Sequence, residues 1–233
     1  MKTSSSGRRI WGALIFGIGV LSSTLLTGGL TWAGLEATLY GFPRYTTERF
    51  DGLSCPLLMT RSETAVLRVH VNNLSDKVIS PIMTIDISTP ALPDTKQVQI
   101  TVQPGETKSL EWAVSPENID RYHFIFAKAN RSPSYPLPTA EALCGILVLD
   151  VPALNGTQIL SIWLALSLAS IPLGLWMWSP RLDTPGIMKA LAIAALGGLL
   201  VSLLGIWMLG VMFLIVIVIM ALTLLRLINI GIK

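Results

Sequence analysis

Four residues carry the side chains best suited to metal binding or redox chemistry: Cys55, His70, His123 and Cys144. The cysteines do not form a CxxC redox pair, and neither has a histidine at metal-ligand spacing in the sequence. Each histidine is predicted to lie in a strand, on the face opposite the apolar residues, so exposure to solvent is the simpler interpretation. A metal site would require the two strands to be neighbours, with a carboxylate or thioether nearby. We therefore expect no cofactor and no metal.

Other catalytic patterns give no support for an enzyme. The sequence contains no nucleophile elbow, glycine-rich phosphate loop or HExxH motif, although it leaves a Ser-His-Asp arrangement open. No predicted membrane crossing has an ionisable residue in its middle third, which argues against ion-coupled transport. We expect a protein without enzymatic activity and without catalytic residues.

The cysteines are expected to pair with each other. Both lie in the polar segment from Glu36 to Asp150, which holds 13 of the 14 acidic residues. If this segment is exported, Cys55 and Cys144 most simply form a disulfide. The bond would close a loop of about 90 residues, for which chain entropy gives at most about 4 to 5 kcal/mol of stabilisation.

Long apolar runs surround this polar segment. Between Lys189 and Arg226 lie 36 uncharged residues, which as one helix would measure about 54 Å against a hydrocarbon core of about 30 Å. Two crossings joined by a turn at Gly205–Gly210 are therefore expected. The uncharged run from Ile10 to Leu35 is longer than the apolar region of a signal peptide, so a retained anchor is favoured over a cleaved leader.

The resulting organisation has four transmembrane helices around one β domain. In order along the chain we predict a cytoplasmic N-terminus (1–9), transmembrane helix 1 (10–35), an interfacial collar (36–52), an extracytoplasmic β-sandwich (53–152), transmembrane helix 2 (158–178), a cytoplasmic loop (179–187), transmembrane helix 3 (188–206), transmembrane helix 4 (209–229) and a cytoplasmic C-terminus (230–233).

Basic residues set the expected orientation. The segment 36–150 carries about −3, whereas the rest of the chain, with 7 basic residues and Asp183, carries +6. This surplus flanks the apolar helices, so it predicts cytoplasmic ends in a plasma membrane rather than a nucleic-acid site. The membrane partners expected are lipid and other membrane-protein subunits.

Alternating apolar residues predict seven short antiparallel strands between Leu53 and Val151, and hence an all-β sandwich. The expected inward positions are Ala65, Leu67, Val69, Val71, Met83, Ile85, Ile87, Val98, Ile100, Val102, Leu110, Trp112, Val114, Tyr122, Phe124 and Phe126. The first strand is expected at Leu53–Thr60 and the last at Ala142–Val151.

The segments Val69-His-Val-Asn-Asn73 and Val98-Gln-Ile-Thr-Val-Gln-Pro-Gly-Glu-Thr-Lys-Ser-Leu-Glu-Trp-Ala-Val114 resemble the immunoglobulin-like modules of prokaryotic surface proteins, of the CARDB and NEW3 kind. The resemblance covers Ser62 to Phe126 and implies adhesion, spacing or assembly without catalysis. The chain departs from antibody domains in the positions of Trp112 and Cys144. The disulfide is therefore expected to join the first and last strands near the membrane rather than cross the core.

Two further patterns suggest binding surfaces. The irregular stretch Lys128–Ala140 is either a partner-docking loop or a plain connection; its candidate partner-binding residues are Ser132, Pro133, Tyr135, Pro136 and Pro138. In helix 3 a small residue recurs every fourth position, which predicts helix packing through Ala190, Ala194, Gly198 and Ser202.

These features favour a non-catalytic accessory or scaffolding subunit of a membrane complex, whose sandwich binds a partner outside the membrane. The alternative is a stand-alone surface adhesin or receptor that binds an external ligand. A third possibility is a sensor that passes ectodomain binding to another protein, since only short cytoplasmic tails are predicted.

Overall fold

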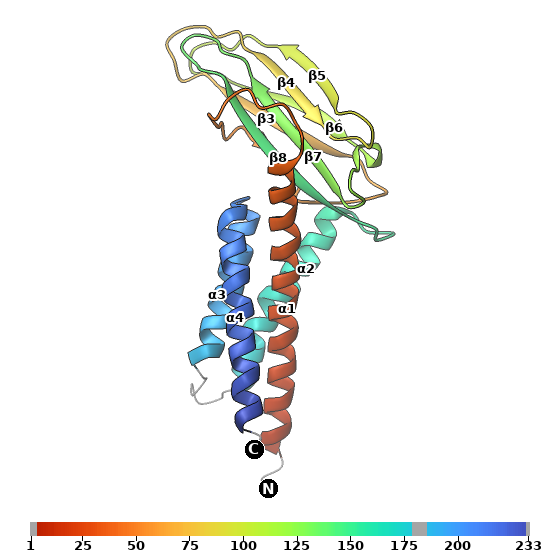
Figure 1. Ribbon diagram of the computed structural model, residues 1–233, viewed down its shortest axis with the longest axis vertical. Coiled ribbons are helices and arrows are strands. Elements are labelled where there is room, and N and C mark those ends of the chain that lie inside the picture. Colours follow the sequence, from red (N-terminus) through yellow and green to blue (C-terminus); the bar gives the residue numbers. More distant parts are fainter. Residues whose placement is uncertain (1–3, 179–185, 232–233) are drawn as a thin grey trace. The chain divides into compact units, whose positions relative to one another are not determined.

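A computed structural model describes residues 4–178 and 186–231, which form four α-helices and a two-sheet β-sandwich (Figure 1). The helices are α1 (Ser4–Leu39), α2 (Gly156–Trp178), α3 (Gly186–Leu203) and α4 (Trp207–Gly231). The strands are β1 (Leu53–Ser54), β2 (Leu58–Thr60), β3 (Ala65–Asn72), β4 (Ile82–Ile87), β5 (Asp94–Gln99), β6 (Thr107–Val114), β7 (Phe124–Arg131) and β8 (Ala140–Leu149). Of the described residues, 4–32, 159–178 and 186–231 belong to a helical unit, and 33–158 to a sandwich unit.

Each of the four helices is long and apolar enough to cross a membrane, so the chain is a multi-pass membrane protein. Most helix ends lie within a few residues of the predicted bounds, but the turn between α3 and α4 is shorter than expected. Gly205 has a φ of +73°, which favours glycine, and α4 already begins at Trp207. Of the predicted loop 179–187, residues 179–185 with Arg181 and Asp183 lie outside the described residues.

Buried hydroxyl groups connect the helices of the helical unit. Ser22 Oγ lies 3.0 Å from Ser167 Oγ of α2, and Ser23 Oγ donates to the carbonyl of Ala195 in α3 at 2.9 Å. The hydroxyls of Thr31 and Ser202 lie 3.1 Å apart. In an apolar environment such pairs join helices that have no hydrophobic drive to associate.

The small residues predicted along α3 lie mainly inside this unit. Ala194, Gly198 and Ser202 are buried, and Ala190 is half-buried. A β-carbon added at Gly198 would stand 3.0 Å from Cβ of Phe213 in α4 and 3.5 Å from the Thr27 methyl of α1. The absence of a side chain at Gly198 therefore lets α3 approach both α1 and α4.

The sandwich consists of a three-stranded sheet, β1-β3-β6, and a five-stranded sheet, β2-β8-β7-β4-β5. The predicted fold class, a membrane α-helical protein with an all-β immunoglobulin-like sandwich, is confirmed. Several details of the prediction were wrong, among them the inward position expected for Tyr122, which is exposed. The expected strand Leu53–Thr60 is divided at Cys55-Pro56 into β1 and β2, which belong to different sheets, and β2 pairs with β8 in parallel. Proline removes a ladder donor, which favours this break.

The expected inward face of β7 was also wrong. Ile125, Ala127 and Ala129 contribute to the core between the sheets, whereas Phe126 packs with Ala37 and Phe42 on the opposite face. The five-stranded sheet thus has a second, partly covered face, which we call the outer face. Because β7 is buried on both faces, its sequence lacks the alternation of a half-buried strand.

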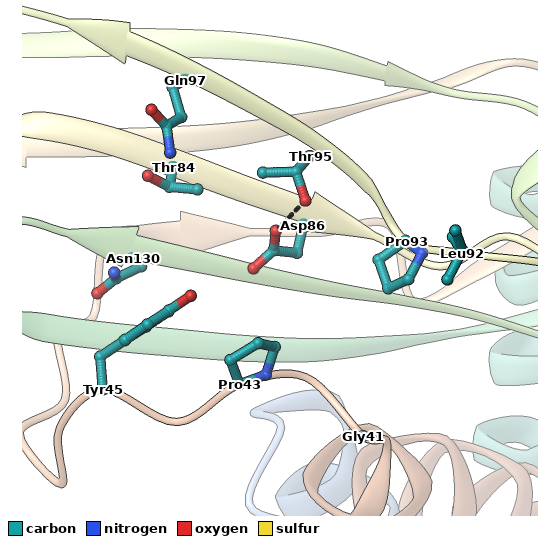
Figure 2. A pocket seen from close by; sticks show the side chains of 10 residues that line it. All are labelled: Gly41, Pro43, Tyr45, Thr84, Asp86, Leu92, Pro93, Thr95, Gln97 and Asn130. Carbon is teal, nitrogen blue, oxygen red and sulfur yellow. Dashed lines mark hydrogen bonds between the residues drawn. The ribbon is translucent and has the colours of Figure 1, made fainter.

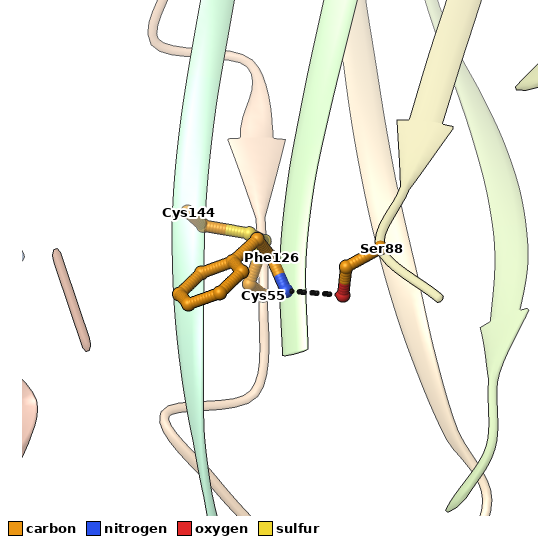
Figure 3. The surroundings of a disulfide bond; sticks show 4 residues. All are labelled: Cys55, Ser88, Phe126 and Cys144. Atoms are coloured by element: carbon orange, nitrogen blue, oxygen red, sulfur yellow. Dashed lines mark hydrogen bonds between the residues drawn. A yellow bond between two sulfur atoms is a disulfide. The ribbon is translucent and has the colours of Figure 1, made fainter. Parts of the chain in front are cut away.

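The predicted disulfide between Cys55 and Cys144 is present and is shown with its surroundings in Figure 3. The Cα atoms of the two cysteines are 6.5 Å apart. The cysteines are separated by 89 positions in the sequence, which is also the separation of the paired residues Leu58 and Leu147 of β2 and β8. The bond joins the β1–β2 connection to the last strand and so anchors the point where the chain changes sheets.

The Gly198 contact can be tested by substitution. Gly198→Leu would place a side chain against Phe213 and Thr27, so we expect a loss of about 1 to 3 kcal/mol of stability from overpacking. The thermal unfolding midpoint in mild detergent measures this loss. Gly17→Leu is the matched control, because a β-carbon at Gly17 meets nothing within 4 Å. Equal midpoints for the two variants would show that Gly198 does not pack as described.

Candidate functional site

The sandwich has two surface regions with the features of a binding site, and the first is formed by two connections. Strand register brings together the β3–β4 connection (73–81) and the β7–β8 connection (132–139), because Met83 pairs with Arg131, which in turn pairs with Ala140. We call these two connections the tip. The β6–β7 connection, with Tyr122, lies at the opposite end of the strands, as does the last residue before α2.

Hydrogen bonds fix the tip in one conformation. Ile82 and Ser132 exchange two of them, N–H to Oγ at 2.7 Å and N–H to carbonyl at 2.9 Å. The backbone N–H of Ser80 donates to Ser134 Oγ at 2.8 Å, and Ser134 and Leu137 close a small turn by pairing their backbone groups. The β7–β8 connection is therefore an ordered feature of the sandwich end. It is shorter than the irregular stretch predicted at Lys128–Ala140, because β7 extends to Arg131.

The tip presents apolar side chains and one cation to solvent. Tyr135 is 76% exposed, and the ammonium of Lys77 lies 4.7 Å from its ring centroid. Leu74 and Val78 of the other connection are also exposed. Of the five predicted residues of the loop, Pro133, Tyr135, Pro136 and Pro138 are exposed, whereas Ser132 is half-buried and supports the loop.

The second region is a hollow of about 690 Å³ on the outer face, shown in Figure 2. Its floor consists of polar side chains from three neighbouring strands, and its walls come from the collar and the β4–β5 connection. The lining residues are Gly41, Pro43, Tyr45, Thr84, Asp86, Leu92, Pro93, Thr95, Gln97 and Asn130. Sequence patterns did not reveal this hollow, because its residues come from four separated segments.

A buried ion pair fixes the collar wall of the hollow. Lys128 Nζ and Glu141 Oε2 are 2.6 Å apart, with side-chain exposures of 1% and 9%. Lys128 also donates to the Pro43 carbonyl, and the Tyr45 backbone N–H donates to Glu141 at 3.4 Å. Lys128 and Glu141 lie in β7 and β8, so the pair joins the collar to both strands.

Next to the ion pair, aromatic packing joins the end of α1 to the sheet. The Tyr40 ring centroid lies 4.7 Å from that of Phe126, and its hydroxyl donates to Asp120 Oδ2 at 2.8 Å. Glu36, in the last turn of α1, forms an ion pair with Arg121. Burial raises the pKa of Tyr40 to about 12, and the hydrogen bond to the Asp120 carboxylate adds to the effect.

The structure does not bring the two histidines together. His70 lies on the exposed face of β3, where its Nδ1 is 2.8 Å from Ser109 Oγ. His123 lies in the turn before β7 rather than in a strand as expected, and it is exposed. Across the described ranges, 4–178 and 186–231, no group of three His, Cys, Asp or Glu side chains is placed to hold a metal ion.

Comparison with known proteins gives likenesses of fold alone. No family model and no curated protein matches the chain. The CARDB domain of a Pyrococcus furiosus protein, solved in complex with di-metal ions, is 17% identical over 42% of this chain and 90% of that one, with a TM-score of 0.35. β-Glucosidases from Listeria innocua and Erythrobacter marinus are 13% and 14% identical, with TM-scores of 0.30 and 0.29.

The glucosidase likenesses cover 41% and 40% of this chain but only 15% and 14% of those enzymes. The predicted resemblance to a CARDB-like module is confirmed at the level of fold. The chain is thus a multi-pass membrane protein with an immunoglobulin-like β-sandwich.

The buried ion pair makes a strong prediction for stability. Lys128→Met leaves the Glu141 carboxylate buried without its cation, and Glu141→Leu leaves the ammonium without its anion, so each should cost about 3 to 5 kcal/mol. The double variant removes both charges and should recover most of that loss. Thermal unfolding of the four proteins measures the coupling, and simple additivity of the two losses would contradict a direct pair.

Tyr40 predicts a loss of stability at alkaline pH. Its pKa is about 12 in the folded protein and near 10 when unfolded, so the folded state holds the proton more tightly. The stability that this proton contributes is complete below about pH 10 and is lost as the pH rises to about 12. Tyrosinate absorbance should show one of the four tyrosines titrating late, and Tyr40→Phe should remove that step. An unchanged titration curve in the variant would contradict this assignment.

Proposed function

We propose that this protein is a non-catalytic accessory or scaffolding subunit of a membrane-protein complex, and that its sandwich binds a partner protein on the extracytoplasmic side. The observation that carries the proposal is the ordered tip. It holds Tyr135, Leu74 and Val78 exposed on a hydrogen-bonded frame, which lowers the entropy lost when a partner binds. Exposed aromatic side chains on such a frame are typical anchors of protein interfaces.

The proposed orientation places both termini in the cytoplasm and the sandwich outside the plasma membrane. It is supported by basic residues near the ends of the apolar helices, including Arg8 and Arg9 near the start of α1 and Lys189 near the start of α3. The Cys55–Cys144 disulfide also fits an oxidising compartment.

The helical unit offers a second support for an assembly. Residues of α4 at alternating spacings of four and three are exposed and large, and together they form one apolar face: Met208, Met212, Ile215, Ile219 and Leu222. Such spacing is that of a helix–helix seam, so this face suits either lipid or a helix of another subunit. The proposal assigns it to another subunit.

The alternative function is a stand-alone surface adhesin or receptor. In that case the same exposed tip would bind an external ligand, and the helices would only anchor the sandwich. The tip geometry suits both functions, so the discriminating measurement is what is attached to the protein in its native membrane.

The experiment combines site-directed cross-linking with purification in mild detergent. A photo-reactive phenylalanine analogue at position 135 should cross-link one membrane-protein partner in intact cells, and the same partner should co-purify stoichiometrically. The analogue at position 122 is the matched control, because Tyr122 is also an exposed tyrosine, 81% accessible, at the other end of the strands. Tyr135→Ala should reduce recovery of the partner about tenfold or more, and Tyr122→Ala should not.

Three results would contradict the proposed function. A lone monomer or homo-oligomer after mild purification would favour the adhesin or receptor. Equal cross-linking from positions 135 and 122 would show that the tip is not the contact surface. Protection of the sandwich from a protease added outside intact cells would reverse the proposed orientation.

A further inference from the structure

We propose that the hollow on the outer face binds one pyranose ring of a saccharide. This inference rests on residues of the hollow alone and is independent of the partner proposed for the tip. The hollow is large enough for a sugar ring, since ligand pockets commonly measure about 300 to 1,000 Å³ and this one measures about 690 Å³.

The floor of the hollow is a flat array of polar groups. Thr84 and Asp86 of β4 pair with Gln97 and Thr95 of β5, and Thr84 also pairs with Asn130 of β7. Side chains two residues apart on a strand are separated by about 7 Å and those on adjacent strands by about 5 Å. A ligand as wide as a sugar ring can therefore reach polar groups of more than one strand at once.

Two floor residues present acceptor oxygens, and one of these oxygens lacks a donor. Asp86 is 5% exposed, and one of its carboxylate oxygens accepts a hydrogen bond from Thr95 at 2.6 Å. The Asn130 amide oxygen is buried and has no hydrogen-bond partner. An unsatisfied buried acceptor is costly, so a ligand hydroxyl that donates to the Asn130 amide oxygen would be stabilised there.

The apolar walls of the hollow suit the C–H groups of a sugar ring. Pro43 belongs to the collar and Leu92 and Pro93 to the β4–β5 connection, and Figure 2 shows the Tyr45 ring reaching from the collar over the strands. A pyranose ring carries C–H groups on its faces and hydroxyls around its rim, so it can contact apolar walls and a polar floor at the same time.

The single charge in the lining, on Asp86, argues against anionic ligands and divalent metal ions. Asp86 repels an anion, and the neighbouring Lys128 does not compensate, because its ammonium is buried in the pair with Glu141. Of the lining residues only Asp86 carries a formal charge at neutral pH, which is too few carboxylates for a calcium or magnesium site. A neutral donor-rich ligand remains the best match.

The test uses the full-length protein in a zwitterionic detergent, because maltoside and glucoside detergents carry the proposed ligand as a headgroup. The probes are the methyl pyranosides of glucose, galactose, mannose and N-acetylglucosamine, followed by saturation-transfer NMR. At least one probe should bind with a Kd on the order of 1 mM, as expected for a ligand of about a dozen non-hydrogen atoms. A comparison of dodecyl maltoside with free maltose distinguishes a lipid-linked headgroup from a free sugar as the ligand. Tighter binding of dodecyl maltoside would indicate a lipid-linked headgroup, and equal binding would indicate a free sugar.

Matched variants connect binding to the hollow. Asp86→Asn preserves an acceptor for Thr95 but removes the charge, so it should weaken binding about tenfold. Gln97→Ala changes an exposed floor residue that can hardly affect folding, and it should also weaken binding. Gln99→Ala is the control, since Gln99 lies two residues further along the same face of β5 and outside the lining.

Several outcomes would overturn the proposal. One is the absence of saturation transfer to all four pyranosides. Another is binding that is unchanged in both Asp86→Asn and Gln97→Ala, or equally weakened by Gln99→Ala. Displacement of the bound sugar by ethanolamine at equal concentration would identify an amine site and would also reject a saccharide ligand.

Discussion

The sandwich depends on burial of the outer face of its five-stranded sheet. Gly145 of β8 lies against the backbone of Ala33 in α1. A β-carbon at position 145 would collide with the Ala33 carbonyl, so β8 needs a glycine there. Beyond it, Phe42 and Tyr40 cover Phe126, and the collar then reaches the Lys128–Glu141 pair. The collar therefore determines which part of the outer face is covered and which part stays open as the hollow.

The same burial explains which strands could be predicted. In β3 one face is exposed, so Leu67, Val69 and Val71 alternate with polar residues and were placed correctly. In β7 the bulky Phe126 was expected in the core between the sheets, yet the small Ala127 occupies that core. Local periodicity cannot tell two buried faces apart, because both are satisfied by apolar side chains.

The candidate sites differ in the same way. Prolines clustered in a single loop mark the tip, so the sequence indicated Tyr135 and its neighbours as a surface feature. The hollow combines Tyr45, Asp86 and Asn130 from separate segments, and no short pattern relates them. Buried charges were equally hidden, since Lys128 and Glu141 in a strand would ordinarily face solvent. They are buried because Lys128 Nζ and Glu141 Oε2 form an ion pair at 2.6 Å, which only the structure shows.

The helical unit and the sandwich unit stabilise their buried polar groups in different ways. The helical unit uses neutral hydroxyls, such as Ser22 with Ser167 and Thr31 with Ser202, which need one partner each and carry no charge into an apolar environment. The sandwich buries an ion pair, Lys128 with Glu141, and the Asp86 carboxylate, which accepts a hydrogen bond from Thr95. The described part of the chain therefore buries charged side chains only in the sandwich, whereas the helical unit buries neutral hydroxyls between its helices.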